Sequence, residues 1–394
     1  MGTYNRRLQI YHVQAGSLKV IHCFRSPVGG LFRHVNDLVR YQAANGLQTG
    51  IICDDSTGRE QAEKVLAELA DVCELGVYRL PITRLPGITD LRSLNKAEKI
   101  CLKIKPDVIH GHGAKGGAYA RLLSRRIAAR SVYTPHGGAL HYNPMSIAGA
   151  IFFTLERLLG RQTDAMVFES RFGAAAYEEK IGAIPCKYKV IHNGLSDAEL
   201  TAPDHVNGEN DFLFLGEFRG LKGLDVLFAA VALLNKDPKN KDRPVKLIVA
   251  GGGRGKPEKL MAEIKAMGLE NSIEISPPIY PATEAFRKTK CIVVPSRAES
   301  LPYIVLEAAA AGVPIITTNV GGIKEIFGPF SDQLIAPDNA EILAQAMRAT
   351  MDNPDETTAK ALQLRERVRS LFRIDQMGHD INAFYTEIVG EQTV

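Results

Sequence analysis

Two glutamates, Glu299 and Glu307, flank a segment whose pattern predicts an anion-binding turn. The apolar run from Cys291 to Val294 predicts a strand, and a short polar loop follows it. Pro302 can then open a helix that Gly312 can close. One carboxylate therefore lies in the loop before the helix, and the other lies about a turn and a half inside it.

The start of this predicted helix supplies backbone hydrogen-bond donors. The first N–H groups of a helix have no partner within it, so here they would point into a cleft and stabilise a diphosphate. The two flanking carboxylates are suited to accept hydrogen bonds from sugar hydroxyls. The alternative is an ordinary strand–turn–helix with two surface glutamates. Besides the glutamates, the predicted site comprises Leu301, Pro302, Tyr303 and Ile304.

A second loop, from Gly216 to Asp225, could neutralise the same anion because it follows a predicted strand and opens a helix. Arg219 can bind phosphate oxygens through two parallel hydrogen bonds, and Lys222 supplies a point charge. Gly223 lets the helix begin close to the phosphates. A solvated charged turn is the alternative interpretation.

Three more loops follow predicted strands in the first half of the chain. Gly29 and Gly30 form a tight turn at the carboxyl edge of the sheet, where open α/β sheets bind ligands. His110 and His112 end another strand, but two histidines without a third ligand make a poor zinc site. We interpret His112 as a candidate acceptor-cleft residue and His110 as a core residue. His136 follows a third strand, and a lone histidine there is more often structural.

The order of these motifs closely resembles that of the retaining nucleotide-sugar glycosyltransferases of family 4 (group 1), whose signature is two glutamates separated by seven residues. The resemblance covers nearly the full chain and implies an α/β protein of the GT-B type. In that fold two Rossmann-like, doubly wound domains face each other across a cleft. One departure is Glu217, since many members have arginine directly after the first glycine. The arginine role is therefore assigned to Arg219.

The resemblance also implies a mechanism and roles for single residues. His136 would line the sugar pocket from the acceptor domain, and Arg219, Lys222 and Glu299 would complete the catalytic set. Glu299 would bind the sugar hydroxyls and Glu307 the ribose hydroxyls, while the Gly29–Gly30 turn would contact the donor diphosphate. The leaving phosphate itself would help to deprotonate the acceptor. No cofactor is implied, and the GT-B architecture normally needs no metal.

Three further patterns receive weaker interpretations. The glycine-rich run from Gly251 to Gly255 resembles a loop near the nucleotide in the donor domain, and it does not match a dinucleotide fingerprint. Asp54 and Asp55 end a strand and could suggest a metal pair, but they lie in the wrong domain for the donor, so we expect a turn there. Asn193–Gly194 is expected to be a turn with left-handed backbone geometry.

Alternating strands and helices predict the domain organisation. Residues 1–192 would form the acceptor-side domain, 193–210 a turn-rich linker, and 211–372 the donor-binding domain. The amphipathic tail, about 373–394, would pack back on the first domain.

Composition narrows the class of protein. The six cysteines are scattered without a CxxC pair, which indicates buried, reduced thiols. The first residues are polar and no run reaches the roughly 18 apolar residues of a membrane span, so we expect a cytoplasmic protein. Aromatic residues make up only 7% of the chain and no nucleic-acid-binding module is recognisable, so nucleic acid is not an expected partner. Nothing in the sequence sets the oligomeric state.

Charge is distributed unevenly along the chain. Residues 1–190 contain 26 Lys and Arg against 16 Asp and Glu, which could attract an anionic membrane or an acidic substrate. Arg121, Arg125 and Arg126 recur at helical spacing, and Met145 to Leu159 is mostly apolar. We expect a lipid-linked glycan acceptor at the cytoplasmic membrane surface, as in bacterial surface polysaccharide synthesis. The alternative is a core helix beside a solvated basic helix.

Two other functions remain open from the sequence. A nucleotide-sugar epimerase of the same architecture would need acid and base carboxylates around the sugar, and the spacing of Glu299 and Glu307 does not resemble that pattern. A non-catalytic subunit that binds a glycan or a nucleotide sugar would keep the fold without turnover. A labelled nucleotide sugar would separate these functions by transfer, epimerisation or binding alone.

Overall fold

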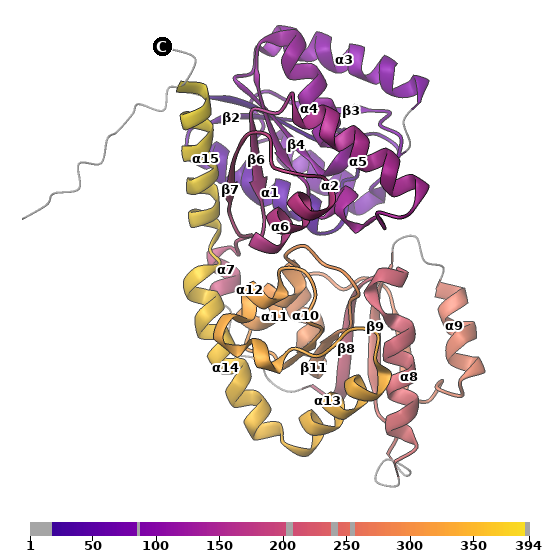
Figure 1. Ribbon diagram of the computed structural model, residues 1–394. Helices are drawn as coiled ribbons and strands as arrows, with labels where there is room; N and C mark the ends of the chain where they lie inside the picture. Colours follow the sequence, from indigo (N-terminus) through magenta and orange to yellow (C-terminus); the bar gives the residue numbers. More distant parts are fainter. Residues whose placement is uncertain (1–17, 85–86, 202–207, 238–242, 253–256, 391–394) are drawn as a thin grey trace, which may run out of the picture.

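The computed structural model describes residues 18–84, 87–201, 208–237, 243–252 and 257–390. Across these ranges the strands form two parallel sheets, each covered by helices, in two domains stacked one above the other (Figure 1). The strand order is β3-β2-β1-β4-β5-β6-β7 in the first sheet and β10-β9-β8-β11-β12 in the second. The predicted fold class, with two Rossmann-like domains, is confirmed.

The elements of the first domain alternate as predicted. They are β1 (Lys19–Phe24), α1 (Gly29–Ala44), β2 (Gln48–Asp54), α2 (Arg59–Ala70), β3 (Val77–Leu80), α3 (Ile88–Ile104), β4 (Val108–His112), α4 (Gly113–Ile127), β5 (Arg130–Thr134), the 3-10 helix η1 (Gly138–His141), α5 (Ile147–Gly160), β6 (Ala165–Phe168), α6 (Arg171–Lys180) and β7 (Lys187–Val190).

The second series begins after a connecting helix and ends with three long helices. The elements are α7 (Asp197–Leu200), β8 (Asn210–Glu217), η2 (Gly220–Lys222), α8 (Leu224–Asn235), β9 (Leu247–Gly252), α9 (Pro257–Ala266), β10 (Ile273–Ser276), α10 (Ala282–Phe286), β11 (Thr289–Val294), α11 (Tyr303–Ala310), β12 (Ile315–Thr317), α12 (Ile323–Phe327), η4 (Gly328–Gln333), α13 (Ala340–Asp352), α14 (Pro354–Leu371) and α15 (Ile374–Gly390).

Strand register brings the loops of the first domain together. Phe24 at the end of β1 lies opposite His112 at the end of β4, and His112 lies opposite Thr134 at the end of β5. The connections that follow these strands therefore leave the sheet at one edge. Since ligands of open α/β sheets bind outside the carboxyl ends of the strands, this edge is the expected place for a site.

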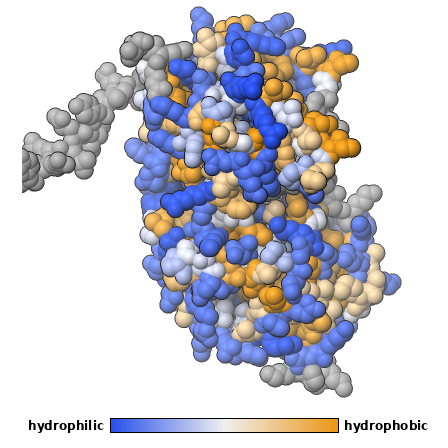
Figure 2. Space-filling view, viewed as in Figure 1, coloured by the Kyte–Doolittle hydropathy of each residue, from blue (hydrophilic) through white to orange (hydrophobic). Residues whose placement is uncertain are grey.

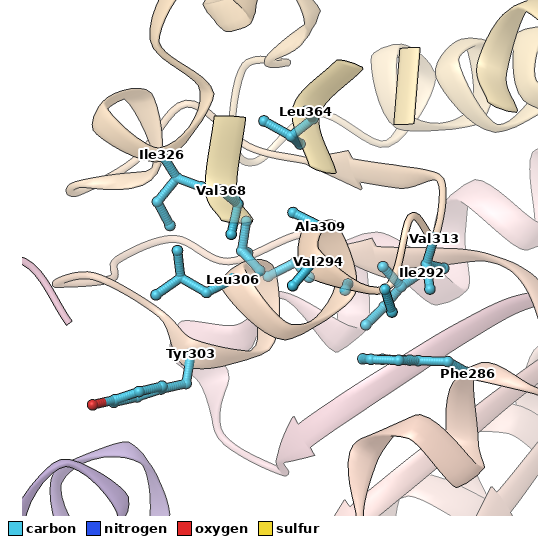
Figure 3. Close-up of a cluster of buried hydrophobic side chains, with 14 of the residues drawn as sticks. Phe286, Ile292, Val294, Tyr303, Leu306, Ala309, Val313, Ile326, Leu364 and Val368 are labelled. Atoms are coloured by element: carbon cyan, nitrogen blue, oxygen red, sulfur yellow. The ribbon is translucent and has the colours of Figure 1, made fainter. Parts of the chain in front are cut away.

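Packing fixes the helix that carries the two-glutamate motif. Leu306 and Ala309 of α11 belong to a buried cluster with Leu364 and Val368 of α14 (Figure 3). Burying each large aliphatic side chain contributes roughly 1.5–3 kcal/mol, so α11 is held firmly against the body of the domain. Tyr303, at the first position of α11, extends from this cluster toward the first domain (Figure 3).

The C-terminal helix α15 returns to the first domain (Figure 1). Its buried side chains, among them Ile381 and Phe384, share a core with Val20 of β1 and Val108 of β4. The chain crosses back where Ile374 N donates to the carbonyl of Leu195 at 2.9 Å. The two domains are therefore joined by two chain segments that run side by side.

The observed elements differ from the expected ones in a few places. β3 was not predicted, because its short sequence is half-buried and lacks a clear apolar period. α4 begins at Gly113, directly after β4 and with no intervening loop. A Cβ at Gly116 would lie 2.1 Å from the carbonyl oxygen of Cys23, so this close approach requires glycine.

Two expectations from composition can be compared with the structure. The six cysteines are free thiols in the described chain, and all except Cys186 are buried. Burial raises the pKa of Cys73 to about 11, so this thiol stays protonated near neutral pH. None of the described helices combines the length and the apolar character that crossing a bilayer requires.

Candidate active site

Lys222 and Glu299 form the centre of the site on the second domain. The Lys222 ammonium lies 2.6 Å from Glu299 Oε1, and the Ser296 hydroxyl donates to the same oxygen at 2.6 Å. Both charged side chains are largely buried, with 24% and 10% of their surfaces exposed. The two predicted phosphate- and sugar-binding groups are thus adjacent, and the carboxylate holds the ammonium in place.

Close backbone packing sets this geometry. Gly223 has a φ of +68°, and a Cβ there would lie 2.1 Å from the carbonyl oxygen of Pro295. Arg297 N donates to the carbonyl of Leu221 at 2.8 Å. The loop that bears Lys222 is therefore fastened directly to the loop that bears Glu299. Only glycine meets the positive φ and the close approach at position 223 without strain.

Arg219 and Glu217 lie together at the opening of the cleft. The Arg219 side chain is 48% exposed, and its Nη1 lies 3.1 Å from Glu217 Oε2. A Cβ built on Gly29 would lie 3.7 Å from Glu217 Oε1, so the glycine turn of the first domain faces this pair. Glu217, the departure from the family pattern, is therefore the partner of the arginine that was assigned the phosphate role.

The Gly29–Gly30 turn also faces the start of α11. A Cβ built on Gly30 would lie 3.7 Å from the Tyr303 ring. Both glycines therefore border the space between the domains, next to the first turn of a helix whose leading amides have no intrahelical partner. Sequence reasoning placed these elements on one cleft, and the structure brings them together.

Glu307 has a partner that was not predicted. Arg33 of α1 donates from Nη1 to Glu307 Oε1 and from Nη2 to Glu199 at 2.5 Å. Its guanidinium also lies over the Tyr303 ring, 4.4 Å from the centroid. Burial raises the pKa of Glu307 and Arg33 lowers it. The effect of burial is larger, so the pKa lies above its ordinary value. The second glutamate of the motif is thus oriented by the opposite domain.

His136 sits at the cleft in a constrained conformation. Its φ of +50° is uncommon for a residue with a side chain, and its Nδ1 lies 2.7 Å from Glu169 Oε1. Ser300, beside Glu299, donates to the other Glu169 oxygen at 2.8 Å. Burial raises the pKa of Glu169, but the electrostatic interaction and the hydrogen bond with His136 lower it by more, so that it falls to about 2. An ionised Glu169 therefore links the histidine to the loop of the two-glutamate motif.

The structure corrects the expectation for His112, which is only 1% exposed. Its Nδ1 lies 3.1 Å from His136 Nε2 and its Nε2 lies 3.0 Å from His22 Nδ1. His112 therefore does not line the cleft, because the strand β4 that carries it is covered on both faces. His110 is fully buried, as expected, and bonds to Tyr385 and Thr134.

Asn193 also differs from its prediction. Its backbone φ is not positive, and its side chain is buried. The Asn193 oxygen lies 2.9 Å from His34 Nδ1, and its amide nitrogen donates to the carbonyl of Leu301 at 2.8 Å. This residue is therefore a bridge between the domains. The adjacent Gly194 allows close approach, since a Cβ there would lie 2.3 Å from the Arg373 backbone.

Two other predicted features have simple outcomes. Asp54 accepts hydrogen bonds from Ser56, Thr57 and the Ile82 amide, which is a turn-stabilising arrangement. Gly251 and Gly252 end β9, while the rest of the glycine-rich run, including Arg254, lies outside the described residues.

The expected basic face on α4 requires a correction. Arg121 is fully buried and lies 2.8 Å from Glu156, with its guanidinium 4.1 Å from the Tyr133 ring centroid. Arg121 cannot meet a membrane, because its charge is already paired inside the first domain. Arg125 and Arg126 are exposed, and Arg126 pairs with Glu98 at 2.8 Å.

Sequence reasoning missed Glu169, Arg33 and His34. Glu169 directly follows β6, as His136 follows shortly after β5, so the strand-end rule that found the histidine could have found the glutamate. Arg33 and His34 come one turn after the glycine pair, on a helix that starts at the cleft. Their positions gave a signal, but only the packing of the domains identifies their partners.

The arrangement is suited to transfer of a group away from a diphosphate. Positive charge from Lys222 and Arg219 and the free amides at the start of α11 surround one region. Glu299 and Glu307 add hydrogen-bond acceptors beside it, and His136 of the first domain is linked to the Glu299 loop through Glu169 and Ser300. Fixed donors and charges aimed at a leaving phosphate stabilise the charge that develops there, which is usually the largest catalytic contribution.

Comparison with known proteins agrees with this geometry. The sequence matches the profile "Glycosyl transferases group 1" over residues 197–370 and the profile "Glycosyltransferase Family 4" over residues 28–199. It is similar to D-inositol 3-phosphate glycosyltransferase of Acidothermus cellulolyticus, with 24% identity over 343 residues, which cover 81% of this chain and 76% of that protein.

Solved structures share the fold. Sucrose-phosphate synthase from Thermosynechococcus elongatus superposes with a TM-score of 0.77 and 19% identity, over 95% of this chain and all of that one. Anabaena Alr3699/HepE in complex with UDP-glucose gives a TM-score of 0.75 with 16% identity, over 94% of this chain and 100% of that one.

Proposed function

Because this chain belongs to the group 1, family 4 glycosyltransferases of GT-B fold, which act on nucleotide sugars, we propose that it transfers a hexose to a glycan hydroxyl with retention at the anomeric carbon. The observation that carries this proposal is the Lys222–Glu299 pair beside the start of α11. It joins a phosphate-binding charge and a sugar-binding carboxylate within 2.6 Å. An epimerase would need a different arrangement of carboxylates around the sugar.

The donor lies between the domains in this proposal. Its diphosphate meets Lys222, Arg219 and the leading amides of α11, while its sugar meets Glu299, and His136 supports this side of the site through Glu169 and Ser300. The ribose meets Glu307, which keeps Oε2 available while Oε1 accepts from Arg33. The structural relative in complex with UDP-glucose supports a nucleoside diphosphate hexose as the donor class.

The transfer needs no protein nucleophile. The leaving phosphate oxygen accepts the proton of the acceptor hydroxyl while the sugar–phosphate bond breaks and the new glycosidic bond forms on the same face. Lys222 and Arg219 stabilise the phosphate charge. Incubation with a labelled nucleotide sugar and an acceptor, followed by analysis of the anomeric configuration of the product, tests this function. Release of epimerised donor, or binding without turnover, would contradict it.

The acceptor is proposed to be lipid-linked and presented at a membrane surface. α5 buries Phe153 and Glu156, but its opposite side exposes Ile147, Ile151 and Leu158, with 83%, 54% and 52% of their surfaces accessible. Figure 2 shows apolar surface at the edge of the first domain where Figure 1 places the ends of α3 and α5. Such an apolar helix face beside basic residues fits the interfacial layer of an anionic membrane.

Vesicle co-sedimentation tests the membrane part of the proposal. The protein should bind anionic vesicles at low salt and bind less as salt rises. Ile147→Asp with Ile151→Asp should abolish binding, and charge reversal at Arg125 and Arg126 should weaken it, without loss of nucleotide affinity. If the wild-type protein ignores anionic vesicles at low salt, the acceptor is soluble, as the name of the inositol 3-phosphate relative suggests for that protein.

A further inference from the structure

A cluster of histidines lies inside the first domain, directly behind His136. In the described part of the chain, the rings of His22, His34, His110, His112 and His136 are neighbours, with centroids 4.0–5.7 Å apart. The first four side chains are buried, and the His136 side chain is 5% exposed. Such a concentration of imidazoles in a core is not needed for packing, and the transfer reaction uses only His136.

Hydrogen-bond partners define the protonated nitrogen of two of these rings. Asn193 donates its amide hydrogen to the carbonyl of Leu301, so its oxygen is the group that faces His34 Nδ1 and accepts from it. His34 Nε2 is then an unprotonated nitrogen, and it is buried without a hydrogen-bond partner among the described residues. His136 Nδ1 donates to the Glu169 carboxylate, so in the neutral imidazole, which is the form that binds a metal, Nε2 carries a lone pair.

The third ring, His112, is defined through a longer chain of bonds. Gln42 donates its amide hydrogen to Asn382, so the Gln42 oxygen accepts from His22 Nε2 at 2.8 Å. His22 Nδ1 is then an acceptor, and His112 Nε2 donates to it at 3.0 Å. His112 Nδ1 therefore carries a lone pair, 3.1 Å from the lone pair of His136 Nε2. When both rings are neutral, two lone pairs at this distance repel each other unless a proton or a metal ion lies between them.

We propose that His34, His112 and His136 bind a divalent transition-metal ion of the zinc class. A nitrogen of each lies within 4.8 Å of a nitrogen of the other two. A tetrahedral ion with metal–nitrogen distances of about 2.0–2.1 Å holds its nitrogen ligands roughly 3.4 Å apart. The nitrogens of His112 and His136 already have nearly this spacing. His34 supplies the third ligand.

The surroundings of the three rings match those of metal ligands. A histidine that binds a metal almost always donates its other N–H to a carboxylate, a carbonyl or another acceptor, which fixes the ring. Here His34 donates to Asn193, His136 to Glu169, and His112 to His22. The orphaned His34 nitrogen also gains a partner, which removes the penalty of burying an unsatisfied polar atom.

A neighbouring set of three histidines is less suited to a metal. His22, His110 and His112 also lie within 4.8 Å by their nitrogens. Both nitrogens of His110 are, however, already bonded, to the Tyr385 hydroxyl at 2.5 Å and the Thr134 hydroxyl at 2.8 Å. Because a histidine binds a metal through one nitrogen, binding there would break one of these two buried hydrogen bonds. Binding by His34, His112 and His136 breaks no hydrogen bond of these rings except the contact between His112 and His136, which the ion replaces.

The ion would also connect the two domains indirectly. Glu169 and Asn193 orient two of the ligands, and both bond to the donor loop at Ser300 and Leu301. The site is separate from Lys222 and the proposed diphosphate position, so the ion is not a phosphate ligand. It would hold His136 in its left-handed conformation at the cleft.

Metal binding by the untagged full chain tests this proposal. After removal of metals with a chelator, the protein should take up one equivalent of Zn²⁺ or Co²⁺, with visible Co²⁺ absorption, and Zn²⁺ should raise its Tm. His34→Gln should abolish uptake. Glu169→Gln should weaken affinity about 10–100-fold, as loss of an outer partner does. His379→Gln, on the exposed side of α15, serves as the matched control and should bind normally.

Two results would overturn the proposal. One is failure of the folded wild-type protein to bind either ion. The other is unchanged uptake by a folded His34→Gln variant, with folding checked by nucleotide binding. In either case a proton, in place of a metal ion, lies between His136 Nε2 and His112 Nδ1, and the histidines form a hydrogen-bonded network.

Discussion

Arg33 of the first domain donates to Glu307 of the second, and the same guanidinium also binds Glu199 and lies near Asp37. Burial lowers the pKa of Arg33, but these three carboxylates raise it by more, so the side chain remains charged. Glu307 begins the second turn of α11, and Arg33 lies one turn into α1 behind the glycine pair. One arginine therefore orients the Glu307 carboxylate, to which we assign the ribose, and connects the two domains.

Arg33→Ala should raise the donor KM about tenfold or more and leave kcat nearly unchanged, because a hydrogen bond to a charged group contributes about 1.5–3 kcal/mol. Arg33→Lys should not restore the KM, since a lysine cannot reproduce the planar fork. Steady-state kinetics with varied donor measure both. The control is Arg40→Ala, on the same helix but paired with Glu68 at the surface. An unchanged donor KM would show that Glu307 needs no support from Arg33.

The two glutamates of the motif should differ in kinetic effect. Glu307→Gln should chiefly raise the donor KM, because a ribose contact is equally strong in the ground and transition states. Glu299→Gln should chiefly lower kcat, by about 10²-fold, because it contacts the reacting sugar and positions Lys222. Equal effects of both substitutions on both constants would contradict these roles.

Glu325 should make the domain junction sensitive to acid. It accepts from the Arg171 and Phe172 amides at the start of α6 and from His192. Burial raises the pKa of Glu325, but these hydrogen bonds lower it by more, so the pKa lies below its ordinary value of 4.5. A lowered carboxyl pKa gives stability that is present above the unfolded-state pKa and is lost as pH falls through the folded-state pKa.

Thermal unfolding from pH 7 to pH 3 measures this effect. Glu325→Gln should have a lower Tm than wild type at pH 7, and the difference should shrink below about pH 4.5. Glu366→Gln, which removes an exposed carboxylate paired with its neighbour Arg365, is the control. A difference that stays constant over the whole range would mean that ionisation of Glu325 does not stabilise the junction.

Transfer should proceed without Mg²⁺ or Mn²⁺, because Lys222, Arg219 and the α11 amides already supply positive charge for the diphosphate. Among the described residues, the candidate metal-binding groups consist of histidines of the first domain, away from Lys222. Initial rates should be the same with and without added Mg²⁺ or Mn²⁺ while Zn²⁺ is held constant. An absolute requirement for either ion would contradict this prediction, because it would mean that a metal ion binds the donor diphosphate.

Much of the donor side could be predicted because each of its residues sits in a short loop with a recognisable local pattern. Lys222 and Glu299 each sit in a loop between a strand and a helix, and local signals identify both loops. Parallel topology then brings the ends of β8 and β11 side by side. Once the strand order is known, the closeness of Lys222 and Glu299 follows from it.

The first-domain partners could not be predicted in this way. Arg33 meets Glu307 only because the two domains close over each other, and nothing local to either residue encodes that distance. The histidine cluster depends on the register of β1, β4 and β5, since a shift of one residue would turn His112 to the opposite face. Arg121 misled the prediction because an arginine at helical spacing looks exposed until its buried partner Glu156 is known.

Nucleoside diphosphate binding and turnover by Lys222→Ala test the central claim most directly. For the wild-type protein, one of UDP, GDP or ADP should raise the Tm, because a ligand that binds only the native state stabilises it. The folded Lys222→Ala variant should bind that nucleotide more weakly and lose about 10²–10³-fold in kcat, since a charge aimed at the leaving phosphate is gone. Near-normal turnover by folded Lys222→Ala would contradict the account, because the donor diphosphate would then have to lie elsewhere.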